Sequence, residues 1–439
     1  MQLASVRNAR GSTRLQPTSS IPVNARSPHR SRVLKVVIVN EGLGYPPKGG
    51  NWLRTINLML PLARRHEITY VCRGVRDEQA EQIAGSFYTE HGIRLRVCGE
   101  PPADKKGPAF YARVAANLGS PLPYSITSHR SEDVRREIRR LANSEDIDLF
   151  QFEASLGYAD TLTGTGARTI VMAHNVETLI WERLYQTEPQ RLKRWFIGDQ
   201  LRKYERYERA VMQGASRVIA VSREDAALLR ERFGVSDPAV VDNGVDVRYF
   251  AAAATTRRPD PKQILFLGSL DWRPNLDAVD VLLARVMPQV LAVEPDAHLA
   301  IVGRNPPPAL IRRLRREPNV ELHADVEDVR PYLAQSAVMA VPLRIGGGSR
   351  LKILEAIASG LPVVTSRIGC EGLIFEPGRD LCVVEGEDQM AAALVGTMRN
   401  PARAEEMVKS GRTVIDAHYD WSRLADRLEQ VWLDLASRP

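Results

Sequence analysis

The sequence predicts a two-domain α/β fold in which each domain is built on a doubly wound parallel sheet. From about residue 33 onward, strand-length apolar runs alternate with helical stretches. The runs are rich in Val and Ile and lack a clean alternation of apolar and polar residues, as expected of strands that are covered on both faces. With 439 residues, 44% of them hydrophobic, the chain is long enough to bury two cores.

Six of the apolar runs precede residue 250 and six follow it. The first six are residues 33–40, 67–72, 93–99, 147–153, 168–174 and 216–222, and the second six are residues 263–270, 297–303, 320–325, 337–343, 361–366 and 381–385. Helical stretches separate them, including one that starts at Trp52 and one over residues 274–292. Residues 251–263 are rich in Ala, Thr and Pro and lack apolar periodicity, which predicts a linker between the domains.

The net charge of +7 is concentrated at the N-terminus. Residues 1–32 contain six arginines and no acidic residue, so the rest of the chain is nearly neutral. This balance argues against a nucleic-acid-binding protein, which needs a basic face. The Ser, Pro and Arg content of residues 1–32 predicts a disordered tail, with an organelle transit peptide or a wrongly chosen start codon as alternatives.

Several other classes of protein are disfavoured. The longest apolar runs are far shorter than the roughly 20 residues that cross a bilayer. The four cysteines are too widely spaced for a CxxC pair and too few for a disulfide framework, which favours reduced thiols in the cytoplasm. The GxGxxG fingerprint is absent after the first strand of either domain, which disfavours hydride transfer. We see no His, Cys and carboxylate cluster at ligand spacing, and so predict no metal and no resident cofactor.

A glycine-rich turn before a helix is the main candidate for a ligand site. In the segment RIGGGSRLKILEA the helix is expected to begin near Leu351, with Lys352 and Glu355 on one face. Helix amides and nearby cations bind diphosphates, and a carboxylate accepts hydrogen bonds from ribose hydroxyls. The alternative is that the cations are solvated and Glu355 only favours the helix dipole. The residues that precede the helix in this turn are Gly346, Gly347, Gly348, Ser349 and Arg350.

A second glycine turn follows the first strand, in YPPKGGNWLR. Its residues Gly49, Gly50 and Asn51 are expected at the carboxyl end of the sheet, where the cleft between two such domains would lie. This signal is weaker, because a Gly-Gly pair is often only a turn.

Two amphipathic helices are predicted outside these turns. Residues 190–211 hold seven basic and three acidic residues around Trp195, Phe196, Tyr204 and Tyr207. Such a helix can bind an anionic membrane, although packing of its aromatic side on the sheet is the commoner arrangement. The apolar spacing of residues 418–435 predicts a second amphipathic helix near the C-terminus.

Five segments resemble the glycosyltransferases of family 4, in the order that the family has them. They are MAHNVETLIWERL, SRVIAVSREDAALL, VDNGVDVRYF, FLGSLDWRPNLDAVDVL and GGGSRLKILEAIASGLPVV, and the resemblance spans about residues 34–435. It is closest to bacterial members associated with polysaccharide export and sortase-like systems. It implies the GT-B fold, two Rossmann-like domains facing across a cleft, and transfer of a sugar from a nucleotide-diphosphate-sugar to an acceptor hydroxyl with retention of configuration and without a metal.

The resemblance also implies roles for residues of the second domain. Glu355 matches the glutamate that binds the donor ribose, whereas Gly347 stands where the family has another glutamate that contacts the donor sugar. Ser269 and Pro274 stand where members commonly have an arginine and a lysine that face the diphosphate. Lys352 and Arg350 are therefore the preferred catalytic cations, with Arg273 third.

Three further assignments come from the resemblance. His174 ends a strand where the family keeps a histidine beside the donor sugar, and the alternative for it is a buried structural histidine. Val326 lies in the loop expected to hold the base. Residues 49–51 would lie on the acceptor side.

The predicted organisation is therefore a tail (residues 1–32), an acceptor-side domain (33–250), a nucleotide-sugar-binding domain (251–418) and a helix that packs back on the first domain (419–439). We expect a saccharide or lipid-linked acceptor, as in polysaccharide or glycolipid synthesis. The expected location is the cytoplasm, with peripheral contact on the inner face of the membrane if residues 190–211 bind it. The alternatives are a catalytically silent GT-B protein that binds nucleotide, and a nucleotide-sugar epimerase of the same fold.

Overall fold

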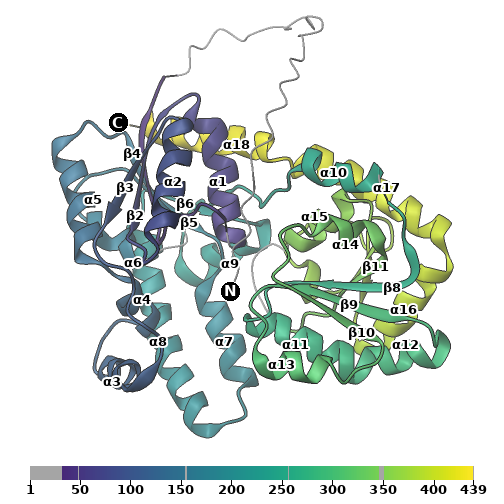
Figure 1. Cartoon of the computed structure of the whole chain (residues 1–439). Coiled ribbons are helices and arrows are strands. Elements are labelled where there is room, and N and C mark those ends of the chain that lie inside the picture. The colour runs from purple at the N-terminus through teal and green to yellow at the C-terminus, as the bar shows by residue number, and fades with distance from the viewer. Residues whose placement is uncertain (1–31, 48, 154–155, 256, 346–350, 439) are drawn as a thin grey trace, which may run out of the picture. The chain divides into compact units, whose positions relative to one another are not determined.

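The computed structural model describes residues 32–438, except residues 48, 154–155, 256 and 346–350. Residues Val33–Pro439 form one compact unit that contains two parallel sheets. We call the part built on the first sheet, residues 33–246, the N-lobe and the part built on the second, residues 247–418, the C-lobe (Figure 1).

The N-lobe sheet has seven strands in the order β3-β2-β1-β4-β5-β6-β7, and each neighbouring pair is parallel. Its strands are β1 (Lys35–Val39), β2 (Glu67–Arg73), β3 (Ile93–Cys98), β4 (Leu149–Glu153), β5 (Thr169–Ala173), β6 (Arg217–Ala220) and β7 (Ala239–Val240). Its helices are α1 (Gly50–Ala63), α2 (Glu78–Glu90), α3 (Gly107–Asn117), α4 (Tyr124–His129), α5 (Glu132–Ser144), α6 (Leu156–Ala159), α7 (Glu177–Thr187), α8 (Arg191–Gly214) and α9 (Arg223–Phe233).

The C-lobe sheet has six parallel strands in the order β10-β9-β8-β11-β12-β13. They are β8 (Asp260–Leu267), β9 (His298–Gly303), β10 (Val320–Ala324), β11 (Ser336–Val341), β12 (Val363–Ser366) and β13 (Cys382–Val384). The helices are α10 (Val247–Thr255), α11 (Arg273–Val281), α12 (Met287–Val293), α13 (Pro308–Leu314), α14 (Arg330–Gln335), α15 (Leu351–Ala358), α16 (Glu387–Arg399) and α17 (Pro401–His418).

Strand β1 shows why its apolar run is continuous. Val36 and Ile38 pack in the core on one face of the sheet, and Val37 and Val39 pack in the core on the other. Because side chains alternate along a strand, a strand covered on both faces needs apolar residues at every position. The predicted class of two doubly wound parallel sheets is confirmed.

All twelve predicted strands are present, and two details differ from expectation. The two-residue strand β7 was missed, since its apolar run is too short to stand out. The predicted linker over residues 251–263 contains regular structure, because the end of α10 occupies its start and β8 begins at Asp260. Alanine favours a helix by its propensity even where apolar periodicity is lacking.

The last helix, α18 (Trp421–Ala436), packs on α1 of the N-lobe (Figure 1). Its Trp432 is fully buried, and Leu424 and Leu428 lie in the same core as Leu58 and Leu62 of α1. Arg65, at the end of α1, pairs with Asp426 and Glu429 of α18. The prediction that the C-terminal helix crosses back to the first domain is confirmed.

Helix α8 is divided between two environments. Tyr204 and Tyr207 in its second half are buried in the N-lobe core, as expected of a helix packed on a sheet. In its first half Leu192 is 79% exposed and Trp195 is 56% exposed. In the described part of the chain, we find no helix long and apolar enough to cross a bilayer.

Candidate functional site

A cavity of about 560 Å³ lies at the carboxyl ends of the strands, which is where parallel α/β sheets bind ligands. The N-lobe contributes the turn of residues 49–51 together with His174 and Glu177, and the C-lobe contributes Ser269, Trp272 and Arg304. A larger cavity of about 780 Å³ is lined by Pro261 and Pro362, which lie at the opposite ends of C-lobe strands. The structure therefore places His174 and residues 49–51 in one cavity, which makes this cavity the candidate site.

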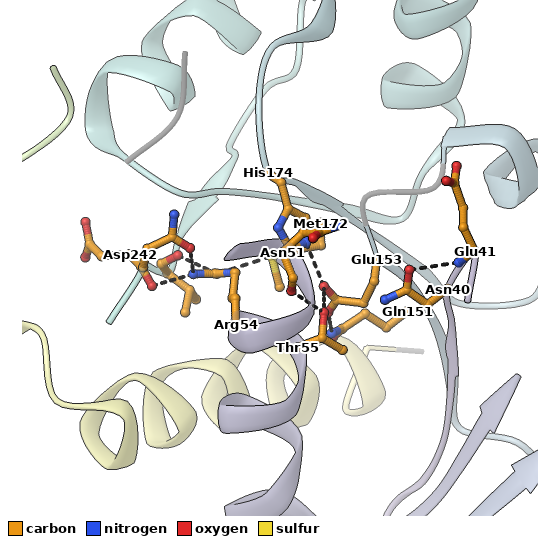
Figure 2. Close-up of polar contacts among 12 residues, drawn as sticks. Asn40, Glu41, Asn51, Arg54, Thr55, Gln151, Glu153, Met172, His174 and Asp242 are labelled. Carbon is orange, nitrogen blue, oxygen red and sulfur yellow. Dashed lines mark hydrogen bonds and ion pairs between the residues drawn. The ribbon is translucent and has the colours of Figure 1, made fainter. Parts of the chain in front are cut away.

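His174 follows β5, and its ring is hydrogen-bonded to a buried carboxylate (Figure 2). Its Nε2 lies 2.7 Å from Oε2 of Glu153, the last residue of β4, whose side chain is almost completely buried. The hydroxyl of Thr55 in α1 donates to the same oxygen at 3.0 Å. Burial opposes ionisation of this carboxyl, but the hydrogen bond and charge of His174 outweigh it and lower the pKa of Glu153. An ionised Glu153 accepts from Nε2–H, so Nδ1 is the ring nitrogen left for other partners.

The contacts of Glu153 continue to the C-terminal helix. Nε2 of Gln151, two residues earlier in β4, donates to Oε1 of Glu153. Oε1 of Gln151 in turn accepts from the indole Nε1 of Trp432 at 2.7 Å. The position of His174 therefore depends on α1, β4 and α18 together.

Lys352, in the first turn of α15, points to the loop that follows β8. Its Nζ donates to Oδ1 of Asn275 at 2.8 Å, and Nδ2 of Asn275 donates to the carbonyl of Ser269 at 2.9 Å. The ammonium also lies 4.9 Å from the ring centroid of Phe266. A Cβ on Gly268 would lie 2.9 Å from this Nζ and 2.8 Å from Nδ2 of Asn275, so a larger residue there would displace this hydrogen-bonded pair. Positions 269 and 274 are Ser and Pro, so they supply no cation themselves. The structure instead places the ammonium of Lys352, from α15, near Ser269.

Glu355 lies one turn further along α15. Burial raises the pKa of its carboxyl to about 7, and the charge of Lys352 opposes this shift. Leu351, the first residue of the helix, reaches the N-lobe turn, because a Cβ on Gly50 would lie 3.0 Å from its Cδ1.

Two family models match this chain. The model described as Glycosyltransferase Family 4 matches residues 49–249, and the model described as Glycosyl transferases group 1 matches residues 261–400. The first model covers most of the N-lobe and the second covers most of the C-lobe, and each includes residues that line the cavity. The chain belongs to glycosyltransferase family 4.

Curated relatives of this family 4 chain include a GDP-mannose-dependent monoacylated alpha-(1-6)-phosphatidylinositol monomannoside mannosyltransferase of Corynebacterium glutamicum. It is 30% identical over 43% of this chain and 54% of its own length. A glycogen synthase of Mycobacterium tuberculosis is 25% identical over 60% of this chain and 65% of its own length. The chain thus spans about half to two thirds of the length of these relatives.

Solved structures share the fold of this chain at low sequence identity. An Anabaena protein, HepE, crystallised with UDP and glucose, superposes with a TM-score of 0.62 at 14% identity, covering 91% of this chain and 99% of that one. Sucrose-phosphate synthase from Thermosynechococcus elongatus gives a TM-score of 0.65 at 18% identity, covering 92% and 99%.

Other predicted site residues of the family 4 chain lie in different surroundings. Arg273, at the start of α11, lies 3.6 Å from the carboxylate of Glu188. Val326 follows β10 and is half-buried against the C-lobe core. The predicted residues Gly346, Gly347, Gly348, Ser349 and Arg350 lie outside the described residues.

Glu177 is a cavity residue that the sequence analysis did not select. It opens α7, and Glu208 of α8 accepts from its backbone N–H at 3.0 Å. Burial, with the nearby charge of Glu208, raises the pKa of Glu177 to about 7. Glu153 was also missed. The signal for it was the pair of polar residues in QFE, which stand at the end of an otherwise apolar strand.

Among the described residues, no group of three or more His, Cys, Asp or Glu side chains is placed to hold a metal ion. The C-lobe cations described above are Lys352 in α15, Arg304 after β9, and Arg273, which pairs with Glu188.

Proposed function

We propose that this chain is a retaining glycosyltransferase that moves a sugar from a nucleotide-diphosphate-sugar to an acceptor hydroxyl, in polysaccharide or glycolipid synthesis. The relatives that this chain resembles support this proposal, since one is a GDP-mannose-dependent mannosyltransferase and another a glycogen synthase. The observation that carries it is Lys352, which Asn275 holds beside the loop after β8.

The charge of Lys352 suits the proposed reaction. When the bond between the sugar C1 and the phosphate oxygen breaks, negative charge builds up on the leaving diphosphate. A fixed ammonium and the amides at the start of α15 stabilise that charge more in the transition state than in the ground state. The acceptor oxygen then bonds to C1, and its proton passes to the leaving phosphate. This scheme needs no resident metal.

Glu355 on α15 and the groups that line the cavity have proposed roles around this reaction. Glu355 would accept hydrogen bonds from the donor ribose, and His174 would contact the donor sugar through Nδ1. Residues 49–51 line the cavity from the N-lobe and would face the acceptor.

A panel of nucleotide-sugars, UDP and GDP tests donor binding by thermal shift. A ligand at 100 times its Kd should add about 2.7 kcal/mol to the free energy of unfolding. Donor binding without sugar transfer to any acceptor would favour the silent GT-B alternative, and consumption of donor without an acceptor would favour the epimerase.

Lys352→Met tests the role of the cation. We expect turnover, measured as release of the nucleoside diphosphate, to fall about a hundredfold or more, while thermal stability changes little. Lys409→Met is the matched control, because Lys409 is an exposed lysine on α17, outside the cavity. If Lys352→Met kept near-normal turnover, the phosphate role of Lys352 would be wrong, and Arg273 would be the next residue to test.

A further inference from the structure

Helix α3 is unusually exposed for a helix of this composition. In the sequence GPAFYARVAAN only Asn117 is buried, although most of the side chains are apolar. Tyr111 is 69% exposed, and Leu118, which follows the helix, is 41% exposed. Tyr111, Ala115 and Leu118 are spaced four and three residues apart, so they share one face of the helix.

The exposed first half of α8 lies next to α3. Nζ of Lys203 in α8 donates to the carbonyls of Asn117 at 2.9 Å and Leu118 at 3.2 Å. Nε2 of Gln200 donates to Oδ1 of Asn117 at 3.1 Å. Trp195 is five residues before Gln200, which is about 7.5 Å along a helix. Figure 1 shows α3 beside this part of α8, at the lower left of the N-lobe.

The charged residues of α3 and of the start of α8 are all basic. Residues 105–118 contain three basic residues and no acidic one, and the same is true of residues 189–198. In the second segment the basic residues Arg191, Lys193 and Arg194 are exposed and alternate with Leu192 and Trp195. The ring of Tyr185, at the end of α7, stacks under the guanidinium of Arg194 at 4.9 Å.

We propose that α3 and the start of α8 form a surface that binds an anionic lipid bilayer. Trp and Tyr favour the level of the headgroups, Leu favours the acyl boundary, and Lys and Arg are attracted to anionic lipids. A protein partner of ordinary composition would leave several of these cations without acidic partners. The surface consists of Tyr111, Leu118, Arg191, Leu192, Lys193, Arg194 and Trp195, and we call it the α3–α8 surface.

The surface lies at the far end of α7 from the cavity. Helix α7 begins at Glu177, which lines the cavity, and ends at Thr187, just before α8. Eleven helical residues span about 16 Å. Binding of the bilayer through the α3–α8 surface therefore leaves the cavity accessible, and it does not depend on the proposed activity.

Co-sedimentation of the full chain with vesicles tests this proposal without any donor or acceptor. We expect binding to vesicles of equal parts phosphatidylglycerol and phosphatidylcholine, weak binding to pure phosphatidylcholine, and weaker binding in 0.5 M NaCl. The triple variant Arg191→Gln, Lys193→Gln, Arg194→Gln should bind the anionic vesicles about a hundredfold more weakly. The control is Arg312→Gln, Arg315→Gln, Arg316→Gln, which removes three exposed arginines in and after α13 and should bind as the unmodified chain does.

The apolar residues have a separate test. Tyr111→Ser with Leu118→Ser, and Leu192→Ser with Trp195→Ser, should each lower vesicle binding about tenfold, whereas Ile83→Ser on α2, where Ile83 is 45% exposed, should not. Brominated phosphatidylglycerol should quench the fluorescence of Trp195, and Trp195→Phe should remove that quenching.

Three results would overturn the proposal: no binding to anionic vesicles, equal binding by the basic triple variant and its control, or quenching that persists in Trp195→Phe. A change of oligomeric state in Leu192→Ser with Trp195→Ser, measured by gel filtration, would show instead that a second copy covers this surface. A chain that binds vesicles but transfers no sugar would leave the membrane surface intact and count only against the proposed function.

Discussion

Glu153 decides which nitrogen of His174 the cavity meets. Its carboxylate can only accept hydrogen bonds when ionised, so His174 must carry its proton on Nε2. An amide at this position could donate to Nε2 instead, which would move the ring proton to Nδ1. The substitution Glu153→Gln keeps the volume. With the amide nitrogen toward His174, the amide oxygen still accepts from Gln151, and the Thr55 hydroxyl accepts from the amide while it donates to the carbonyl of Asn51.

We expect Glu153→Gln to lower turnover by about tenfold or more, because a misplaced hydrogen bond to the substrate costs about that much. The free energy of unfolding should change by no more than about 1 kcal/mol, since the buried network stays paired. Nitrogen-15 NMR of His174 gives the decisive measurement, because the two ring tautomers have different spectra. An unchanged spectrum in the variant would contradict the positioning role of Glu153.

If Glu355 binds the donor ribose as proposed, donor binding should depend on pH. If its carboxylate must be ionised to accept from two ribose hydroxyls, the fraction of competent protein falls below its pKa of about 7. The Kd for UDP or GDP should therefore be about tenfold higher at pH 6 than at pH 8. Calorimetric titrations at the two pH values check this expectation. In Glu355→Gln the dependence on pH should disappear, and a slope that survived would assign it to another group.

At the scale of elements, α18 connects the end of the chain to the site. Trp432 is buried in the N-lobe core, and its indole is the hydrogen-bond partner of Gln151 in β4. Helix α18 therefore both covers the sheet and holds the side chains behind His174.

Trp432→Phe should lower the free energy of unfolding by about 1–3 kcal/mol beyond its packing cost, because it leaves the buried oxygen of Gln151 without its indole partner. Trp421→Phe, a buried tryptophan on the same helix, is the matched control for lost ring volume. Urea denaturation of both variants gives the comparison. Equal losses would mean that packing alone explains the effect of Trp432.

At the scale of the whole molecule, two carboxyls should make stability depend on pH, that of Glu177 in the cavity and that of Glu355 on α15. Burial raises the pKa of Glu177 and of Glu355 to about 7, above the ordinary value of 4.5. Between those values the folded chain binds more protons than the unfolded chain, so its stability falls as pH rises. Above pH 7 the full cost of ionising each of these half-buried carboxyls is present.

Glu177→Gln and Glu355→Gln should therefore each gain up to about 3 kcal/mol relative to the unmodified chain between pH 5 and pH 8. Urea denaturation without ligand at the two pH values measures the difference. The exposed Glu405→Gln on α17 is the control, for which we expect no such gain. A gain that was the same at both pH values would rule out ionisation as its cause.

The sequence by itself determined the sheets and the family. Most of the twelve predicted strands were recognisable because a strand covered on both faces must be apolar along its whole length, whereas the edge strands β3 and β10 are less apolar and less buried. The glycine turns and the segments around His174 and Glu355 were also visible, because each is a contiguous motif. The roles of Lys352, Glu355 and His174 stay predictions until they are tested.

Only the tertiary structure decided how the polar residues of the site meet. Glu153 reaches His174 because β4 lies beside β5, with Glu153 in register with Met172. Lys352 meets Asn275 across 77 residues of sequence, and Trp432 meets Gln151 across 281. The periodicity that reveals a strand reports only its own burial, whereas a hydrogen bond between distant segments depends on strand order and register. The sequence showed that the first half of α8 combines basic and apolar residues. Only the tertiary structure showed that Leu192 and Trp195 are exposed beside α3.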